Sequence, residues 1–230
     1  MIVVIHQPDY LPWLGFFDRL DKSDLFVILD DVQFIKRGYH NRNRIKTPKG
    51  WQWLTVPVVN EFPLPKLNRT RIDNNSNWRK QHWTALRLNY GRSPFFNKYA
   101  DFFEETYERN WGMLSELNIY LIRNLMDMLG LNTPVIKSSS LNVAGRKTEL
   151  MVNICKEVGA DTYLSGTGAK DYLIDEEFDK AGLKLIYQNF IHPTYRQRFG
   201  DFQPYMSIVD LLFNCGDNSL EVIRGKVITE

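Results

Sequence analysis

The stretch that decides the fold is Met1–Leu20, MIVVIHQPDYLPWLGFFDRL. Its apolar run Ile2–Ile5 lacks polar alternation, which is typical of a strand buried on both faces in the middle of a parallel sheet. Pro12 suits the first turn of a helix. Apolar side chains then recur with helical spacing, at Trp13, Phe16, Phe17 and Leu20. The polar segment between this strand and this helix therefore lies where open α/β sheets bind their ligands.

Strand-like and helix-like segments continue to alternate along the chain. We expect further strands at about 25–29, 51–59, 133–137, 162–164 and 183–187, and helices at about 77–90, 93–103, 113–129, 148–158 and 206–213. Strands alternating with helices predict an α/β fold with a mostly parallel, Rossmann-like sheet. The three consecutive helices predict a helical insertion at about 77–130 within a single α/β domain that spans residues 1–230.

Composition and charge exclude several classes of protein. The chain has 29 Lys and Arg against 27 Asp and Glu, and this net charge of +2 is too small to indicate a nucleic-acid or membrane partner. No apolar stretch is long enough to span a bilayer, and no basic segment precedes the first strand as in a signal peptide. Cys155 and Cys215 lie in amphipathic runs, which predicts reduced core thiols. The His and Cys spacing predicts no metal site. We therefore expect a cytoplasmic protein.

The first candidate site follows the first strand and contains His6, Gln7 and Tyr10. A histidine beside a helix N-terminus can donate hydrogen bonds to an anion, and it can serve as a general acid or base near neutral pH. Tyr10 can stack on a base or a sugar. The structural alternatives are a histidine that binds a buried carbonyl group and a tyrosine that belongs to the core.

The second candidate site follows the second strand. Asp30 and Asp31 are paired carboxylates that can hold a metal-bound phosphate, a ribose hydroxyl or an amine. The segment after them contains no acid before Glu61, and arginine forks bind phosphate well. Its candidate binding residues are Lys36, Arg37, Arg42, Asn43 and Lys46. A solvated turn with ordinary surface charge is the alternative. The segment also resembles a small nucleic-acid-binding patch, but the nearly neutral charge of the protein gives this interpretation little support.

The third candidate site is the glycine-bearing segment after the strand at 162–164. Gly166 and Gly168 allow backbone N–H groups to approach a phosphate, with Ser165 before them and Lys170 adding charge. The pattern matches neither a Walker A motif nor G-x-G-x-x-G, so an ordinary glycine turn is the alternative.

The fourth candidate site is a segment near the C-terminus with His192, Tyr195 and Gln197, whose side chains can face one ligand. The alternative is a rigid loop whose histidine binds the backbone. The carboxyl ends of parallel strands meet at one edge of a sheet, so the four candidate sites should lie close together. We expect all four loops to converge on a single anion-sized hollow that contains His6, Arg42, Lys170 and His192.

Four motifs together resemble the WbqC-like family. They are His6-Gln7-Pro8-x-Tyr10-Leu11-Pro12-Trp13-x-Gly15-Phe16, Asp30-x-Val32-Gln33-Phe34 with the following Lys/Arg-Asn-Arg segment, Tyr163-Leu164-Ser165-Gly166, and His192-Pro193-x-Tyr195-x-Gln197. The resemblance covers nearly the whole chain. The family is named after gene clusters for bacterial surface polysaccharides such as O-antigen and lipopolysaccharide. It therefore implies work on nucleotide-linked sugars, some of which carry aminoacyl groups on a sugar nitrogen.

A more distant likeness is to the nucleotidylyltransferase and pantothenate-synthetase superfamily. Those enzymes hold ATP phosphates with a histidine motif between their first strand and first helix. His6 stands alone here, because Trp13 and Gly15 occupy the stretch where a second histidine would follow. This departure argues against adenylyl transfer and is compatible with phosphate binding at the same place.

The resemblance implies a transferase or ligase that forms an amide on the amino group of a nucleotide-linked sugar, with an acyl or aminoacyl donor as second substrate. His6 or His192 would take the proton of the amine, and Asp30 or Asp31 would orient that amine or a metal ion. The basic segment and the glycine segment would hold the diphosphate. One alternative is a ligase that uses ATP with magnesium to make an acyl-adenylate first. The other is a protein that binds a nucleotide sugar without converting it.

Overall fold

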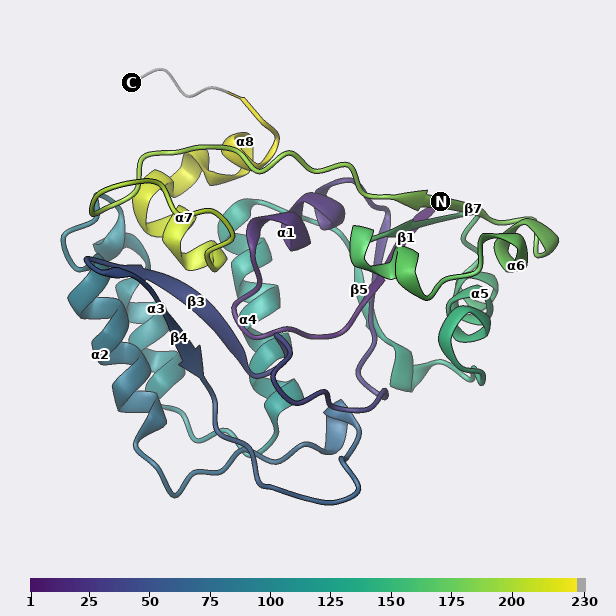
Figure 1. The fold of residues 1–230 in the computed structure, drawn as a ribbon, viewed down its shortest axis with the longest axis horizontal. Coiled ribbons are helices and arrows are strands. Elements are labelled where there is room, and N and C mark those ends of the chain that lie inside the picture. Colours follow the sequence, from purple (N-terminus) through teal and green to yellow (C-terminus); the bar gives the residue numbers. More distant parts are fainter. Residues whose placement is uncertain (227–230) are drawn as a thin grey trace.

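A five-stranded sheet in which all strands run parallel forms the centre of the molecule (Figure 1). The computed structural model describes residues 1–226 of the chain. The strand order is β5 (Val135–Lys137), β2 (Leu25–Ile28), β1 (Ile2–His6), β6 (Thr162–Ser165) and β7 (Lys184–Tyr187). The predicted Rossmann-like α/β fold is confirmed, and the apolar run after Met1 is its central strand.

Both faces of β1 are covered, which explains why its sequence does not alternate. Val4 packs into a core that includes α1 (Leu14–Asp21) and α4 (Leu114–Leu129). Val3 and Ile5 pack into a second core with α5 (Lys147–Glu157) and α6 (Asp175–Lys180). Figure 1 shows these two pairs of helices on opposite sides of the sheet. Apolar side chains at successive positions are therefore all removed from water.

The three helices predicted between the two halves of the sheet are present. They are α2 (Trp78–Tyr90), α3 (Phe96–Glu108) and α4. Asn118 on α4 is fully buried, and its side-chain amide donates to the carbonyl oxygens of Pro8 and His40, each at 2.7 Å. One residue of the helical stretch therefore fixes both the segment that follows β1 and the segment that precedes β3.

The predicted basic loop is partly a strand. β3 (Arg42–Thr47) pairs antiparallel with β4 (Gly50–Thr55) in a separate two-stranded sheet. The strand was not predicted because its alternation is not one of polar and apolar residues. Arg42, Arg44 and Lys46 alternate with Asn43 and Ile45, so one of the two inward positions is also polar. β4 ends at Thr55, earlier than predicted, before a proline that lacks the N–H group needed for ladder bonds.

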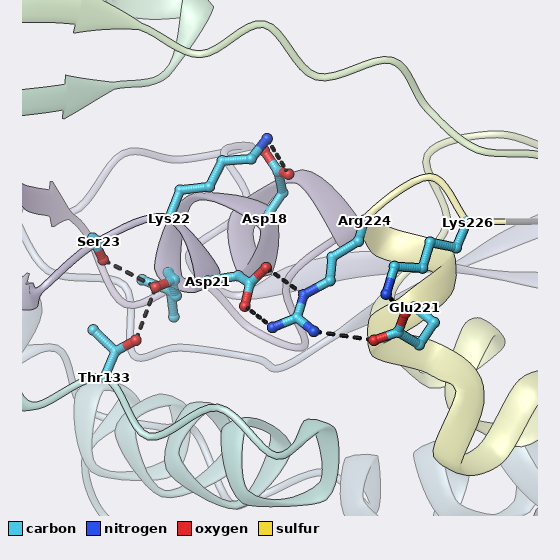
Figure 2. A network of polar contacts seen from close by, with 9 residues as sticks. Asp18, Asp21, Lys22, Ser23, Thr133, Glu221, Arg224 and Lys226 are labelled. Carbon is cyan, nitrogen blue, oxygen red and sulfur yellow. Dashed lines mark hydrogen bonds and ion pairs between the residues drawn. The ribbon is translucent and has the colours of Figure 1, made fainter.

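The end of the described chain returns to the first helix. Residues 188–207 contain no helix or strand. They lead into α7 (Ile208–Cys215) and α8 (Ser219–Ile223). Arg224 donates to the two carboxylate oxygens of Asp21 on α1, at 2.9 and 2.7 Å, and also to Glu221 (Figure 2). This bidentate ion pair fastens α8 to α1, which leads away from β1.

Two expectations from composition can be compared with the structure. Cys155 is buried, Cys215 is half-buried, and both are free thiols, as predicted. Among the helices of residues 1–226, none combines the length and the hydropathy that crossing a bilayer demands.

The role of Asn118 in joining α4 to two loops can be tested by substitution. We expect Asn118→Ala to lower the free energy of unfolding by about 2–4 kcal/mol, because two buried carbonyl groups lose their donors. Urea unfolding at pH 7 measures this. Asn124→Ala is the matched control on the same helix, since the Asn124 amide donates to the Tyr120 carbonyl one turn away and to no other group within residues 1–226. A loss for Asn124→Ala as large as that for Asn118→Ala would contradict the assignment.

Candidate functional site

A cleft of about 500 Å³ opens at the carboxyl ends of β1 and β6. From β1 the sheet grows outward through β2 and β5, and it then continues on the other side of β1 with β6 and β7. The strand order therefore reverses between β1 and β6, and such switch points are where open α/β sheets bind ligands. His6 ends β1 and Ser165 ends β6, and both residues line the cleft.

Arg19 of α1 is a buried cation in the wall of this cleft. It is only 4% exposed, and its Nε atom is buried without a hydrogen-bond partner. Within residues 1–226 the guanidinium has no carboxylate at ion-pair distance, although Asp9 and Asp18 are near enough to influence its pKa. Burial lowers the pKa of Arg19, but a guanidinium stays charged in proteins. A buried charge without a partner is costly, so an anionic ligand would stabilise this site.

His6 presents a neutral imidazole to the cleft. Its Nδ1 atom lies 2.8 Å from the Gln7 carbonyl oxygen, so Nδ1 carries the proton and Nε2 has a free lone pair. Burial lowers the pKa of His6 to about 3, and the charge of Arg19 contributes in the same direction. The ring meets Phe16 edge to face at 5.2 Å, which fixes its orientation. His6 can therefore accept a hydrogen bond at neutral pH.

Asp9 is the group in the cleft that titrates near neutral pH. Its side chain is 14% exposed, and Oδ2 lies 3.9 Å from Nδ1 of His6. Burial raises the pKa of Asp9 to about 7, and Arg19 opposes this shift only in part. A carboxyl group with such a pKa can both accept and release a proton at physiological pH. Asp9 is thus the best-matched acid or base in the cleft.

The N-terminus of α5 forms another part of the wall. Lys147, Leu150 and Met151 line the cleft from this helix. No side chain caps the helix, so its first N–H groups lack partners within the helix. Lys147 has a φ of 51°, in the left-handed region that costs energy for a residue with a side chain. Lys147 therefore adds a positive charge to the lining of the cleft that contains Arg19.

The glycine segment lies beside the same arginine. Ser165, Gly166 and Gly168 line the cleft. A Cβ atom on Gly166 would lie 3.2 Å from Nη1 of Arg19, so glycine permits the close approach of the guanidinium. Lys170 does not line the cleft, and its ammonium group lies 5.1 Å from the centre of the Tyr187 ring. The segment therefore contributes small groups to the cleft and no charge.

Comparison with known proteins places this chain in a family. The profile of the WbqC-like protein family matches residues 7–222. The chain belongs to the WbqC-like protein family. It is also 38% identical over 225 residues to the uncharacterized protein Rv1507c of Mycobacterium tuberculosis, a match that covers 96% of this chain and 97% of the relative. No solved structure matches the chain.

Tyr10 of this WbqC-like chain belongs to the core. Its ring is fully buried, and its hydroxyl group lies 2.8 Å from Nδ1 of His82 and 2.5 Å from the hydroxyl of Tyr107. A ligand in the cleft cannot stack on this ring. The predicted core alternative therefore describes Tyr10, whereas its neighbours His6 and Gln7 line the cleft.

Asp30 and Asp31 join the ends of two neighbouring strands. Asp30 accepts hydrogen bonds from the Ser138 hydroxyl at 3.2 Å and from the backbone N–H and hydroxyl of Ser139 at 3.0 and 2.7 Å. Asp31 accepts from Ser138 at 2.5 Å and lies 3.7 Å from Lys66. Neither carboxylate lines the cleft. Their oxygens are used to hold the segment after β5 against the end of β2.

The predicted phosphate-binding residues between β2 and β3 also lie outside the cleft. Lys36 and Arg37 border a separate small pocket of about 160 Å³. The guanidinium of Arg42 lies 4.3 Å from the centre of the Trp53 ring, on the hairpin. Asn43 is buried, and its amide donates to a backbone carbonyl at 2.7 Å.

Three predicted residues belong to a buried network around Asp210. The carboxylate of Asp210 accepts hydrogen bonds from Tyr195 and Gln197, each at 2.7 Å. The ammonium group of Lys46 donates to Oε1 of Gln197 at 3.1 Å. Because these groups satisfy one another inside the protein, Lys46, Tyr195 and Gln197 stabilise the C-terminal region rather than line the cleft.

Both ring nitrogens of His192 have backbone partners. Nδ1 donates to the Pro193 carbonyl at 2.8 Å, and Nε2 accepts from the N–H of Tyr205 at 3.1 Å. The ring also stacks on Trp13, with an interplanar angle of 16°. The predicted convergence is therefore wrong in part. The loops after β1, β2 and β6 share the cleft, but the fourth loop does not line it. Of the four side chains expected in one hollow, His6 lines the cleft, and Arg42, Lys170 and His192 lie elsewhere.

Several further residues that line the cleft were not predicted as site residues from the sequence. They are Asp9, Arg19, His40, Lys147 and Tyr172. Asp9 and Arg19 carried a signal, because both are charged residues next to apolar positions of the decisive stretch. His40, Lys147 and Tyr172 reach the cleft through tertiary structure alone. Within residues 1–226 no cluster of three His, Cys, Asp or Glu side chains is arranged to hold a metal ion.

The raised pKa of Asp9 predicts a specific dependence of stability on pH. Between pH 4 and 7 the unfolded carboxyl group is ionised, while the folded one keeps its proton, so this group makes the protein less stable as pH rises. We expect the stability of Asp9→Asn relative to the natural protein to increase by up to about 4 kcal/mol over this range. Chemical unfolding at several pH values measures the difference.

His6→Gln is the control with the opposite sign. The lowered pKa keeps folded His6 neutral while the unfolded histidine gains a proton, so the natural protein loses stability as pH falls from about 6.5 toward 3. The relative stability of His6→Gln should therefore rise as the pH falls. A constant difference for both variants would show that neither group is desolvated in the folded protein.

Proposed function

We propose that this WbqC-like protein is an enzyme that binds a nucleotide-linked amino sugar in the cleft and forms an amide on the sugar nitrogen. The observation that carries the proposal is the buried Arg19 guanidinium, which lacks a carboxylate partner within residues 1–226. The family's association with bacterial surface polysaccharides supports the choice of a nucleotide-linked sugar. The proposal makes this a cytoplasmic enzyme of that biosynthesis.

The diphosphate of the sugar nucleotide is the anion that best suits the positive part of the cleft. Arg19 offers a planar fork that can donate two parallel hydrogen bonds to one phosphate. Lys147, the first residue of α5, lines the same cleft and adds a second positive charge. Gly166 and Gly168 leave room for backbone groups to approach the ligand. These groups are already in place without the ligand, so binding requires little loss of side-chain and loop freedom.

The amino group of the sugar requires an acceptor for its proton. The uncharged amine attacks the acyl carbon of the donor, the new C–N bond forms, and the bond to the leaving group of the donor breaks. The surplus proton of the nitrogen passes to the carboxylate of Asp9, whose pKa of about 7 suits a general base. Nε2 of His6 accepts a hydrogen bond from the amine and holds it in line.

Substitution of Arg19 tests the binding part of the proposal. Arg19→Gln removes the charge and retains a polar side chain, so we expect affinity for dTDP- and UDP-linked sugars to fall at least 10-fold, because charge-assisted bonds are lost. Its free energy of unfolding should not fall, because within residues 1–226 the guanidinium has no carboxylate at ion-pair distance to lose. Calorimetric titration and urea unfolding measure the two quantities. Arg87→Gln, on an exposed position of α2, is the control.

The same titrations separate the alternatives. Binding of ATP with magnesium in preference to nucleotide sugars, with release of AMP on turnover, would favour an adenylate-forming ligase. Binding of a nucleotide sugar without conversion in the presence of acyl donors would identify a protein that only binds it. Unchanged affinities in Arg19→Gln would remove the basis of the proposal.

Substitution of the proposed base tests the chemical part. Asp9→Asn should bind the nucleotide sugar and lose at least 100-fold in turnover, because no carboxylate can take the proton. In the natural protein the rate should rise with pH up to about 7 and then level off, since only the ionised carboxyl group is active. A pH–rate profile of both proteins is the measurement. A variant with the same profile as the natural protein would exclude Asp9 as the base.

A further inference from the structure

The β3–β4 hairpin carries aromatic rings and arginines on one face. Its register places Arg44 opposite Trp53 and Lys46 opposite Trp51. The guanidinium of Arg42 lies 4.3 Å from the centre of the Trp53 ring, and that of Arg44 lies 5.2 Å from Trp51. Cations and rings therefore alternate along this face at distances typical of cation–π contacts.

These rings continue to the edge of the cleft. Tyr39 lines the cleft, and its ring centre lies 6.0 Å from that of Trp53. Trp51 in turn meets Trp53 edge to face at 5.7 Å. Tyr39 and Trp51 are 47% and 44% exposed, so both present apolar surface to water. We call Tyr39, Arg42, Arg44, Trp51 and Trp53 the aromatic face.

The aromatic face carries positive charge without compensation. Nε of Arg42 and Nε of Arg44 are buried without partners, and within residues 1–226 neither guanidinium pairs with a carboxylate. Their hydrogen bonds go to the backbone carbonyls of Arg37 and Tyr205. No acidic residue occurs between Asp31 and Glu61 in the sequence. The face therefore suits a ligand that combines a planar ring with negative charge.

We propose that the aromatic face binds the nucleoside of the nucleotide-linked sugar, with the base stacked along Tyr39 and the hairpin tryptophans. This inference rests on the proposed function, which assigns the diphosphate to Arg19 and α5. A nucleotide sugar is a linear molecule with the diphosphate between sugar and nucleoside. If the sugar lies at His6 and Asp9, the nucleoside leaves the cleft past Tyr39, the ring shared by the cleft and the face. Arg42 and Arg44, which lie against the hairpin tryptophans, are then near the nucleoside.

A comparison of ligands with and without a nucleoside tests the inference. We expect UDP and dTDP to bind more tightly than inorganic pyrophosphate, and to quench tryptophan fluorescence. Trp51→Ala and Tyr39→Ala should each weaken binding of these nucleotides roughly 10-fold or more, because one stacking contact is lost. Neither should change binding of pyrophosphate. Both side chains are exposed, so these variants should fold, which circular dichroism verifies.

Phe62 supplies the control away from the cleft. It is 98% exposed, and it neither lines the cleft nor belongs to the aromatic face. Phe62→Ala should bind UDP as the natural protein does. A loss of UDP binding in Phe62→Ala as large as that in Trp51→Ala would show that the loss does not report stacking on the aromatic face, and would overturn the inference.

The remaining outcomes separate this inference from the proposed function. If pyrophosphate binds as tightly as UDP in every variant, the nucleoside makes no contact, and only the inference is overturned. If neither pyrophosphate nor any nucleotide binds, the proposed function and the inference both fail. If a single-stranded oligonucleotide binds far more tightly than UDP, with steep salt dependence, the face is a nucleic-acid surface and the inference is again overturned.

Discussion

Two hydrogen bonds from the buried amide of Asn118 determine the shape of the cleft. They reach the carbonyl groups of Pro8 and His40, which belong to segments on either side of α1 and β2 in the sequence. Neither segment is a helix or strand at these points, so their backbone polar groups need partners from elsewhere. The three-helix stretch supplies that partner from α4. The Rossmann-like sheet places the ends of its strands, and α4 then fixes the loops around them.

The electrostatics of the cleft are those of a site built for a charged ligand. Burial leaves Arg19 as a charge without a carboxylate partner within residues 1–226, and it moves the pKa values of His6 and Asp9 toward their neutral forms. A protein selected only for stability would pair or replace such groups. These groups lie where the strand order reverses, which is the ligand-binding position of such sheets. The stability that they cost is therefore explained by a role in binding.

The sequence was sufficient for the parallel sheet and its main helices, but it was insufficient for the β3 strand and for the contacts of side chains. Ile2–Ile5 predicted the central strand because burial on both faces leaves a continuous apolar run. Arg42, Lys170 and His192 could not be placed, since their positions depend on tertiary contacts with Trp53, Tyr187 and the Tyr205 backbone. A charged side chain in a loop needs an interaction partner. The sequence alone does not show whether that partner is a ligand or another part of the protein.

The pairing of β1 with β6 has a consequence for synthesis of the chain on the ribosome. Ile2 lies beside Thr162, so one edge of the central strand stays unpaired until most of the polypeptide has been translated. An apolar strand with a free edge is prone to pair with other nascent molecules. The wall of the cleft formed by Ser165 and Gly166 is also absent until then. A ligand that binds in the cleft can therefore assist only the last stage of maturation.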